Sequence, residues 1–274
     1  MIRKILIIFV FFLLPFNNVY AADLAETLKS FLISQTPSEE ENQSTNNLSI
    51  PIKLAGNGKE AVFVMPMITV AKFVAYLSQK HDFANMIEFC QQVKKVDNKD
   101  VGFWDQVTGQ AYEEQGEMDR AIDYYLKAYQ SKEQGPFAAF RLWGIYNFYK
   151  DDKVAASEWL GKFSSTLSSY TILPPDRVKM NIERDTFNFG NYFLNEARDF
   201  DRANKYFEMV LQIDPENSRA KLNILLGKLN SYIKLGDKAG IDKTKSELKN
   251  FAQQTTDQEV VAHIDNILKQ VEEK

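Results

Sequence analysis

Residues 109–128 read GQAYEEQGEMDRAIDYYLKA, and they give the clearest indication of how this chain folds. The small residues Gly109 and Ala121 alternate there with the large side chains of Tyr112 and Tyr125. Small residues at such intervals let two antiparallel helices approach closely, while large side chains fill the seam between them. A helix pair of this length cannot bury its own apolar face, so the pattern predicts a stack of several such pairs.

The second half of this pattern recurs along the chain as an acidic or turn residue, then a small or apolar anchor, with a large side chain four residues later. The anchors and their partners are Ala121 with Tyr125, Ala155 with Trp159, and Ala203 with Phe207, and a degenerate earlier copy has Met86 with Cys90 in place of the aromatic residue. Consecutive anchors lie 35, 34 and 48 residues apart. The long last interval coincides with the Ser164–Ser169 run and with Pro174-Pro175, which predict an inserted loop.

In this pattern the chain resembles the tetratricopeptide repeat (TPR) family, whose units recur every 34 residues. The resemblance covers about Pro66–Phe251 and is strongest around Ala121 and Ala203, where Asp214-Pro215 matches the proline that ends the family's unit. It implies an all-α fold, a right-handed solenoid of helical hairpins. TPR-like units are expected over residues 66–163 and 184–274, with the loop at residues 164–183 between them.

The C-terminal units are expected to include a helix near Arg219–Leu235, a turn at Gly236-Asp237 and a helix near Lys238–Gln253. Apolar residues then form one stripe along Asp257–Glu273. Such an amphipathic helix can cap the last apolar face of a solenoid, and docking onto a partner is the alternative.

The N-terminus carries the features of a secretory signal peptide. Arg3 and Lys4 precede the apolar run Ile5–Leu14, and Val19-Tyr20-Ala21 offers a peptidase site. We therefore expect residues 1–21 to be removed and the protein to be periplasmic or secreted, which would change the net charge from −4 to −6. The run is shorter than the roughly 20 residues that span a bilayer; an uncleaved anchor, with membrane contact, is the alternative.

Residues 22–65 are expected to form an arm, a linker and a small extended element. Asp23–Ser34 predicts a short amphipathic helix or an ordered but passive arm. Gln35–Ser49 is polar and predicts a flexible linker. Ile50–Met65 predicts a small β-hairpin, because Asn57-Gly58 suits a two-residue turn.

In TPR arrays the first helix of each pair lines a concave groove in which partner peptides lie. The positions of this chain that match the groove are Gln106, Gln110, Glu113, Phe140, Asn147, Phe148, Asn188, Tyr192 and Asn195. Amide side chains suit the role because each can donate to and accept from an extended backbone. The alternative is a solvated groove without a dedicated ligand.

The sequence offers little that indicates catalysis or cofactor binding. His81 and His263 lie far apart without the spacing of metal ligands, and no phosphate-binding loop or nucleophile motif occurs, so neither a metal nor a cofactor is expected. Cys90 replaces an aromatic residue and is expected to be a buried small hydrophobe. An acidic chain of mixed charge also argues against nucleic acid as a partner.

These observations predict a non-enzymatic scaffold that binds an envelope or secretion-related protein through its groove. The alternative is a small envelope enzyme or ligand-binding protein built on helical hairpins.

Overall fold

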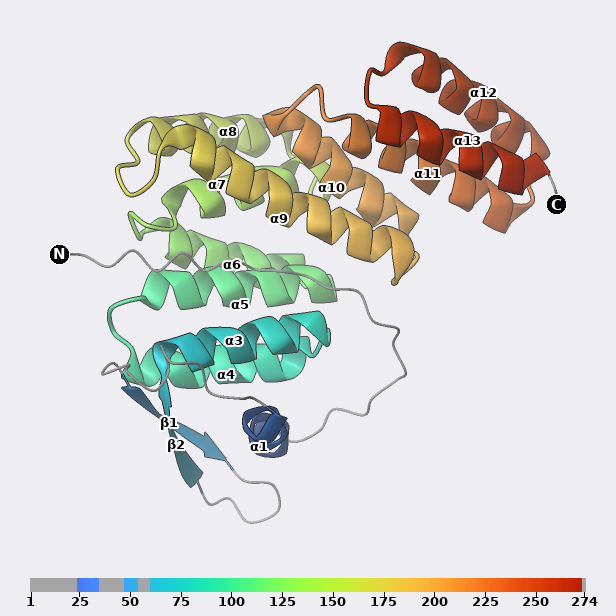
Figure 1. Ribbon diagram of the computed structural model, residues 1–274. Helices are drawn as coiled ribbons and strands as arrows, with labels where there is room; N and C mark the ends of the chain where they lie inside the picture. The colour runs from blue at the N-terminus through green and yellow to red at the C-terminus, as the bar shows by residue number, and fades with distance from the viewer. Residues whose placement is uncertain (1–23, 35–46, 54–59, 273–274) are drawn as a thin grey trace. The chain divides into compact units, whose positions relative to one another are not determined.

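The computed structural model of the chain describes residues 24–34, 47–53 and 60–272 (Figure 1). The predicted signal peptide, residues 35–46 of the predicted linker and the Asn57-Gly58 turn lie outside the described residues. Within the described part, the chain is predominantly helical, which confirms the coarse class of the predicted fold.

The chain divides into two compact units, which meet in sequence between Ile172 and Leu173. The first unit holds two strands, β1 (Asn47–Lys53) and β2 (Glu60–Pro66). Its helices are α1 (Leu24–Ser34), α3 (Met67–Gln79), α4 (Phe83–Val96), α5 (Val101–Gln115), α6 (Met118–Tyr129), α7 (Gly135–Phe148) and α8 (Lys153–Ser168). The second unit holds α9 (Pro175–Asn195), α10 (Phe200–Ile213), α11 (Ser218–Leu235), α12 (Lys238–Gln254) and α13 (Gln258–Glu272).

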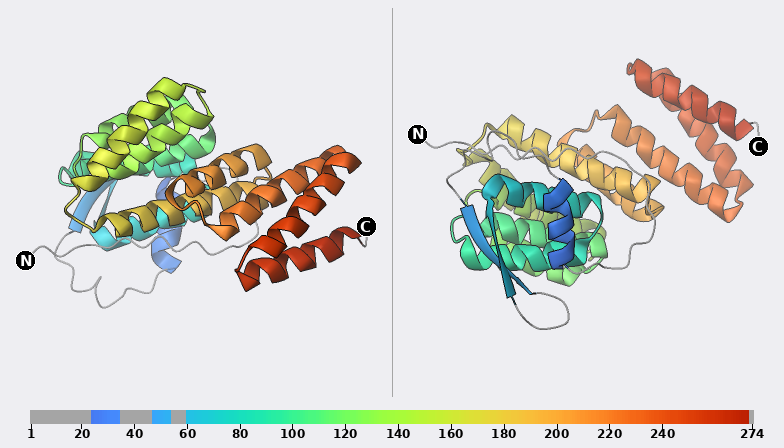
Figure 2. Two further views of the ribbon diagram at one scale, coloured as in Figure 1. Left: turned by 90° about the horizontal axis from the view of Figure 1, so that it is seen from above. Right: turned by 60° about the horizontal axis from the view of Figure 1, so that its bottom comes forward.

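The two strands form the predicted antiparallel hairpin, in which Ile50 pairs with Phe63. Strand β1 begins at Asn47, so the end of the predicted linker is ordered, and that part of the prediction is wrong. Ile50 and Ile52 are fully buried because the strand lies against α1 and α4 (Figure 2). Helix α1 confirms the predicted amphipathic helix, since Leu28 is fully buried in the same core.

Helices α3 to α12 form five consecutive hairpins, and one turn chemistry joins the two helices of each. In every hairpin, the residue just before the N-cap of the second helix has a left-handed backbone conformation. From the first hairpin to the fifth, these residues are His81, Gly116, Asp151, Arg198 and Gly236. The N-caps themselves are, in the same order, Asp82, Glu117, Asp152, Asp199 and Asp237. Each aspartate caps by accepting a bond from the backbone N–H three residues later, which satisfies an otherwise unpaired donor.

The first helices of successive hairpins contact one another within each unit. Arg141 of α7 forms an ion pair with Glu113 of α5, with 3.7 Å between Nη1 and Oε1. In the second unit, the side-chain amide of Asn223 in α11 donates to Oδ1 of Asn191 in α9 at 2.9 Å. Both contacts join first helices that are separated in the chain by a second helix.

The second helices of successive hairpins of the first unit also contact one another. Gln91 of α4 donates to the hydroxyl of Tyr124 in α6 at 3.4 Å. The rings of Tyr129 in α6 and Trp159 in α8 meet edge to face, with 5.1 Å between centroids. First helices and second helices therefore form two layers in this unit, as stacked hairpins require.

Close approach inside a hairpin depends on glycine, as the sequence pattern predicts. A Cβ atom at Gly109 would lie 2.9 Å from the ring of Tyr125, and one at Gly190 would lie 2.6 Å from the ring of Phe207. Both distances are shorter than side chains tolerate, so only glycine lets the paired helix come so near.

The predicted loop at residues 164–183 is mostly helical, which corrects the prediction. Helix α8 continues to Ser168 because Phe163 and Leu167 are buried on one side of it. The serine hydroxyls near the end of α8 do not break the helix, since the hydroxyl of Ser168 donates to the carbonyl of Ser164 at 2.8 Å within the same helix. Pro175, which was predicted to lie in the loop, is instead the first residue of α9, a position that suits proline.

Two further boundaries differ from the predictions. The predicted start of the C-terminal units at residue 184 falls inside α9, a single helix of 21 residues. The anchor of the third hairpin is Ala156, which is buried, and Ala155 is only partly buried. Ala156 lies four residues after its N-cap, as Ala121 and Ala203 do after theirs.

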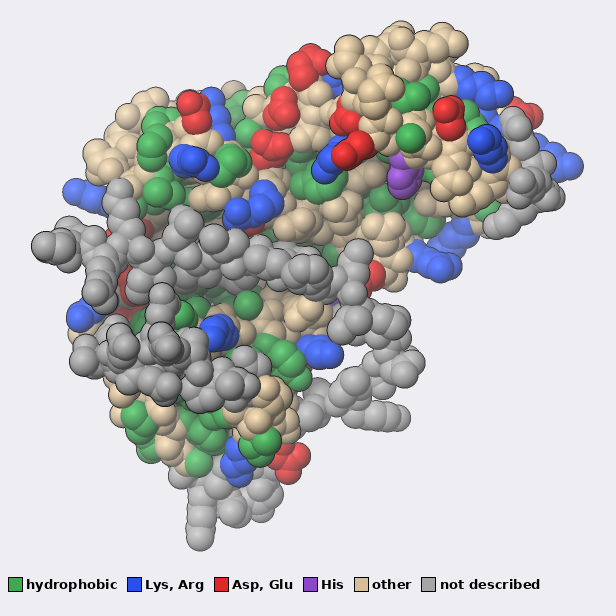
Figure 3. All heavy atoms as spheres, viewed as in Figure 1, with side chains coloured by type: hydrophobic (Ala, Val, Ile, Leu, Met, Phe, Trp, Pro, Cys, Tyr) green, Lys and Arg blue, Asp and Glu red, His purple; other side chains and the backbone are tan. Residues whose placement is uncertain are grey.

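The C-terminal elements follow the predictions closely. Helices α11 and α12 flank Gly236-Asp237, and α13 covers the predicted amphipathic stretch. Val260 and Ile264 of α13 are buried in a core with Leu248 of α12. The face shown in Figure 3 carries both acidic and basic side chains along the helices of this unit.

Acidification is expected to destabilise the first unit through His81. Burial lowers the pKa of His81 from 6.5 to about 4, so the folded chain binds fewer protons than the unfolded chain between these values. The contribution of neutral His81 to the free energy of unfolding is complete above pH 6.5 and is lost as the pH falls towards 4. Between pH 7 and 4, we expect the free energy of unfolding of wild type to fall by about 1–2 kcal/mol more than that of His81→Asn. Solvent screening makes this difference smaller than the full pKa shift would give.

Urea unfolding at both pH values measures this difference. Asparagine tolerates the left-handed backbone of residue 81. The exposed His263 provides the control, since His263→Asn should keep the wild-type pH dependence. Equal pH dependence in wild type and His81→Asn would contradict the prediction.

Candidate functional site

The groove positions predicted on α5 and α7 lie in two neighbouring first helices, but not all of them are accessible. Gln106 and Gln110 are partly buried, whereas Glu113 is buried. The hydroxyl of Tyr125 donates to Oε2 of Glu113 at 2.5 Å, so this carboxylate belongs to the interior of the hairpin. The prediction that Glu113 faces a partner is therefore wrong.

The α7 positions divide in the same way. Phe140 is fully buried, with its ring 5.2 Å from that of Phe163 in α8, so its predicted place in a groove is also wrong. Asn147 and Phe148 are partly buried at the end of the helix. The backbone carbonyl of Asn147 accepts a bond from Lys153 Nζ at 2.8 Å.

The three α9 positions belong to the second unit. Asn188 and Tyr192 are partly buried, and Asn195 is exposed. All three therefore have surface that a partner can reach. The Arg141–Glu113 contact joins α5 to α7 within the first unit, whereas α9 belongs to the second unit.

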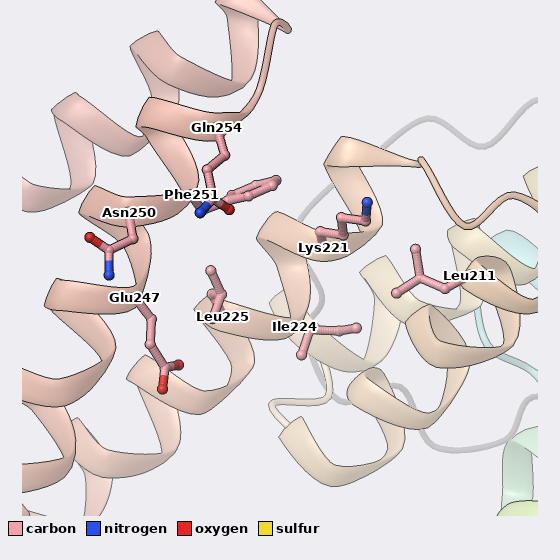
Figure 4. A pocket seen from close by; sticks show the side chains of 8 residues that line it. All are labelled: Leu211, Lys221, Ile224, Leu225, Glu247, Asn250, Phe251 and Gln254. Carbon is pink, nitrogen blue, oxygen red and sulfur yellow. The ribbon is translucent and has the colours of Figure 1, made fainter.

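The second unit contains a hollow that the sequence reasoning missed, a groove of about 350 Å³ between α10, α11 and α12 (Figure 4). We call it the α11 groove. Its apolar lining comes from Leu211, Ile224, Leu225 and Phe251, and its polar lining comes from Lys221, Glu247, Asn250 and Gln254. A few polar groups around an apolar lining are typical of ligand-binding sites.

Polar side chains border the α11 groove from two of its helices, α11 and α12. Lys221 lies on α11 and forms an ion pair with Glu216 at 3.1 Å. Glu247, Asn250 and Gln254 all project from the last turns of α12. In Figure 4, Leu225 and Ile224 lie between the polar side chains of α12 and the side chain of Leu211. The groove can therefore bind an apolar group and hydrogen-bond the polar atoms that flank it.

A second hollow of about 480 Å³ lies where the turns of two hairpins of the first unit meet. Its charged side chains are paired: Arg120 lies 2.9 Å from Glu117, and Lys150 lies 2.5 Å from Asp119. The Lys150–Asp119 pair joins the two turns, and both pairs account for the polar lining of this hollow.

Burial fixes the protonation state of two groups that could take part in chemistry. Burial raises the pKa of the Cys90 thiol to about 12, so the thiol stays protonated at neutral pH. The lowered pKa of His81 keeps its imidazole neutral there. No group of three or more His, Cys, Asp or Glu in the described ranges could hold a metal ion. Nor does any described helix have the length and apolar character to cross a membrane.

Comparison with known proteins assigns no family to the chain. A scan against protein-family models gives no match, and a search of curated proteins gives no significant match. The functional proposal therefore rests on the sequence and geometry of the chain itself.

Proposed function

We propose that this chain is an exported, TPR-like scaffold that binds a protein partner in the cell envelope. The observation that carries the proposal is the turn shared by all five hairpins, a left-handed residue followed at once by the N-cap of the second helix. Repetition of one turn at five places is typical of a chain built from one repeating unit.

The spacing and packing of the helices support the same proposal. The first three hairpins begin at Met67, Val101 and Gly135, which are 34 residues apart, the period of the TPR family. First helices contact first helices in both units, and second helices contact second helices in the first unit. A right-handed solenoid is the arrangement that we infer from these features.

Partner binding is proposed for the accessible positions of the first helices. These are Gln106, Gln110, Asn147, Phe148, Asn188, Tyr192 and Asn195. Their amides can hydrogen-bond an extended peptide backbone, and Phe148 and Tyr192 can supply aromatic anchors. Export is proposed from the Arg3-Lys4 and Ile5–Leu14 pattern, with Ala22 as the mature N-terminus.

Site-specific crosslinking in the producing cell tests the proposal. A photoreactive phenylalanine analogue at Gln110 or Asn188, on first helices, is expected to capture one discrete polypeptide at least about fivefold more than at control positions. The controls are Asp123 of α6 and Glu158 of α8, which are exposed on second helices. The intact mass of the purified chain should show the loss of residues 1–21.

Equal capture at all four positions, or none at Gln110 and Asn188, would contradict a partner-binding first-helix face. Retention of residues 1–21 would contradict the proposed export and leave the membrane-anchored form.

A further inference from the structure

The β-hairpin of the first unit has two outer edges, one on each strand. In the described part of the chain, β1 and β2 pair only with each other. The hairpin packs against α1 and α4 at one end of this unit (Figure 1). Each strand therefore has a row of backbone N–H and C=O groups on the side away from its partner strand.

The two prolines of the hairpin show which backbone groups point outward. Pro51 lies opposite Val62, and Pro66 lies opposite Asn47, so both prolines belong to the same alternate set of residue pairs. Proline has no N–H to donate, so these are the non-hydrogen-bonded pairs of the antiparallel ladder. The backbone N–H and C=O groups of the residues in these pairs point away from the opposite strand.

Val62 and Val64 both belong to this set, and they lie on the outer edge of β2. Outside the ladder, no backbone hydrogen bond between described residues involves either valine. Their side chains are open to solvent, with exposed fractions of 62% and 65%. A row of unpaired N–H and C=O groups fits the backbone of another extended strand.

The two edges of the hairpin differ in how well they resist such pairing. Pro51 interrupts the edge of β1 because it offers no donor there, and proline is one of the residues that protect a free edge. The edge of β2 lacks this protection, since the run Ala61–Met65 contains neither proline nor a charged residue. The edge of β2 is therefore the one that can accept another strand.

We propose that β2 pairs with the β2 strand of a second copy of this chain, in an antiparallel register centred on Phe63. Val62 then lies opposite Val64 of the second copy, and the two residues exchange both of their N–H···O=C bonds. The two-fold axis repeats this pair, so the outward backbone groups of both valines are satisfied in each copy. The two hairpins together form one continuous sheet.

The strand is complementary to itself in this register. Ala61 lies opposite Met65 of the second copy, and Phe63 lies opposite its own equivalent across the axis. Val62 and Val64 of the two copies form an apolar cluster on the exposed face, and no like charges face each other along Ala61–Met65. A second copy therefore satisfies both the backbone and the side chains of this edge. The inference does not depend on the proposed function.

Sedimentation velocity of the purified chain over a range of concentrations tests the proposal. Wild type is expected to show a monomer–dimer equilibrium. Val64→Lys should weaken the dimer at least about tenfold, because it places a charge from each copy within the apolar cluster. Ser49→Lys is the matched control, since it adds the same charge to the same exposed face but on β1. It should change the dissociation constant by no more than about twofold.

Cysteine pairs test the register. When Val62→Cys and Val64→Cys chains are mixed, the two cysteines of a mixed dimer lie directly opposite each other, about 5.5 Å apart between Cα atoms, which suits a disulfide. In a sample of either variant alone, like residues lie a diagonal step apart, about 7–8 Å, which is too far for an unstrained disulfide. The mixture should therefore form crosslinked dimers at least about fivefold faster than either variant alone. The buried Cys90 does not compete.

The proposal is overturned if wild type stays monomeric at about 1 mM, the result expected if the edge binds a different protein or another segment of this chain. It is also overturned if Val64→Lys and Ser49→Lys dimerise equally, or if the mixed and single cysteine samples crosslink at the same rate. Urea midpoints equal to that of wild type would show that the lysine variants fold. A monomeric chain would leave the proposed scaffold unchanged, since crosslinking at Gln110 and Asn188 tests that separately.

Discussion

Arg141→Met is expected to lower the free energy of unfolding of the first unit by about 3–5 kcal/mol. The guanidinium of Arg141 and the carboxylate of Glu113 are both buried, with exposed side-chain fractions of 7% and 2%. Methionine has a similar length but no charge, so the substitution leaves a carboxylate in the interior without its cation. Uncompensated buried charge is among the most costly changes in a folded protein.

Tyr125 contacts the same carboxylate, but it cannot take the place of the cation. The hydroxyl of Tyr125 donates to Glu113, and burial followed by the charge of Glu113 raises the pKa of Tyr125 well above its usual value. That hydroxyl therefore remains a neutral donor. Glu114 is also buried nearby and adds further negative charge.

Two further variants separate buried charge from lost packing. Arg141→Met with Glu113→Leu and Tyr125→Phe removes the buried ion pair together with the hydroxyl that contacts it, and should recover most of the lost stability. Arg219→Met breaks an exposed ion pair with Glu259 and should cost less than about 1 kcal/mol. Equal losses for Arg141→Met and Arg219→Met, measured by urea unfolding, would show that the buried pair is no more important than a surface one.

The helical hairpins could be predicted from sequence because their signals are local. An acid directly before the second helix caps its first turn, and a small anchor four residues later marks the buried face. Asp199 and Ala203 show both signals, and so do Glu117 and Ala121, except that the side chain of Glu117 makes no capping bond. The β-hairpin and α1 could be predicted for the same reason, since alternation and helical periodicity are visible within a few residues.

The site could be predicted only in part because burial of a polar residue depends on distant segments. Glu113 has the amphipathic position of a groove residue, and its partner Arg141 comes from another helix. The α11 groove is lined by side chains from three helices, and no local pattern indicates that they come together.

Gly190→Val is expected to lower the stability of the second unit by about 3 kcal/mol. Phe207 is fully buried, and three of its ring atoms would lie 2.6–2.9 Å from a Cβ atom at residue 190. The ring cannot move away easily, because a close-packed interior has no free volume to receive it. Helices α9 and α10 must therefore separate, and the neighbouring contacts between Phe193 and Tyr206 weaken with them.

Gly161→Val is the matched control, since a Cβ atom there meets nothing within 4 Å. Valine and glycine have comparable helix propensities, so this change should alter stability by less than about 0.5 kcal/mol. Hydrogen exchange should show the Gly190→Val loss in α9 and α10, where the rings pack. If the two variants unfold at the same urea concentration, the helices do not depend on glycine for their approach. The stacked-hairpin basis of the proposed scaffold would then lose its main packing argument, because close approach is what lets each hairpin bury its seam.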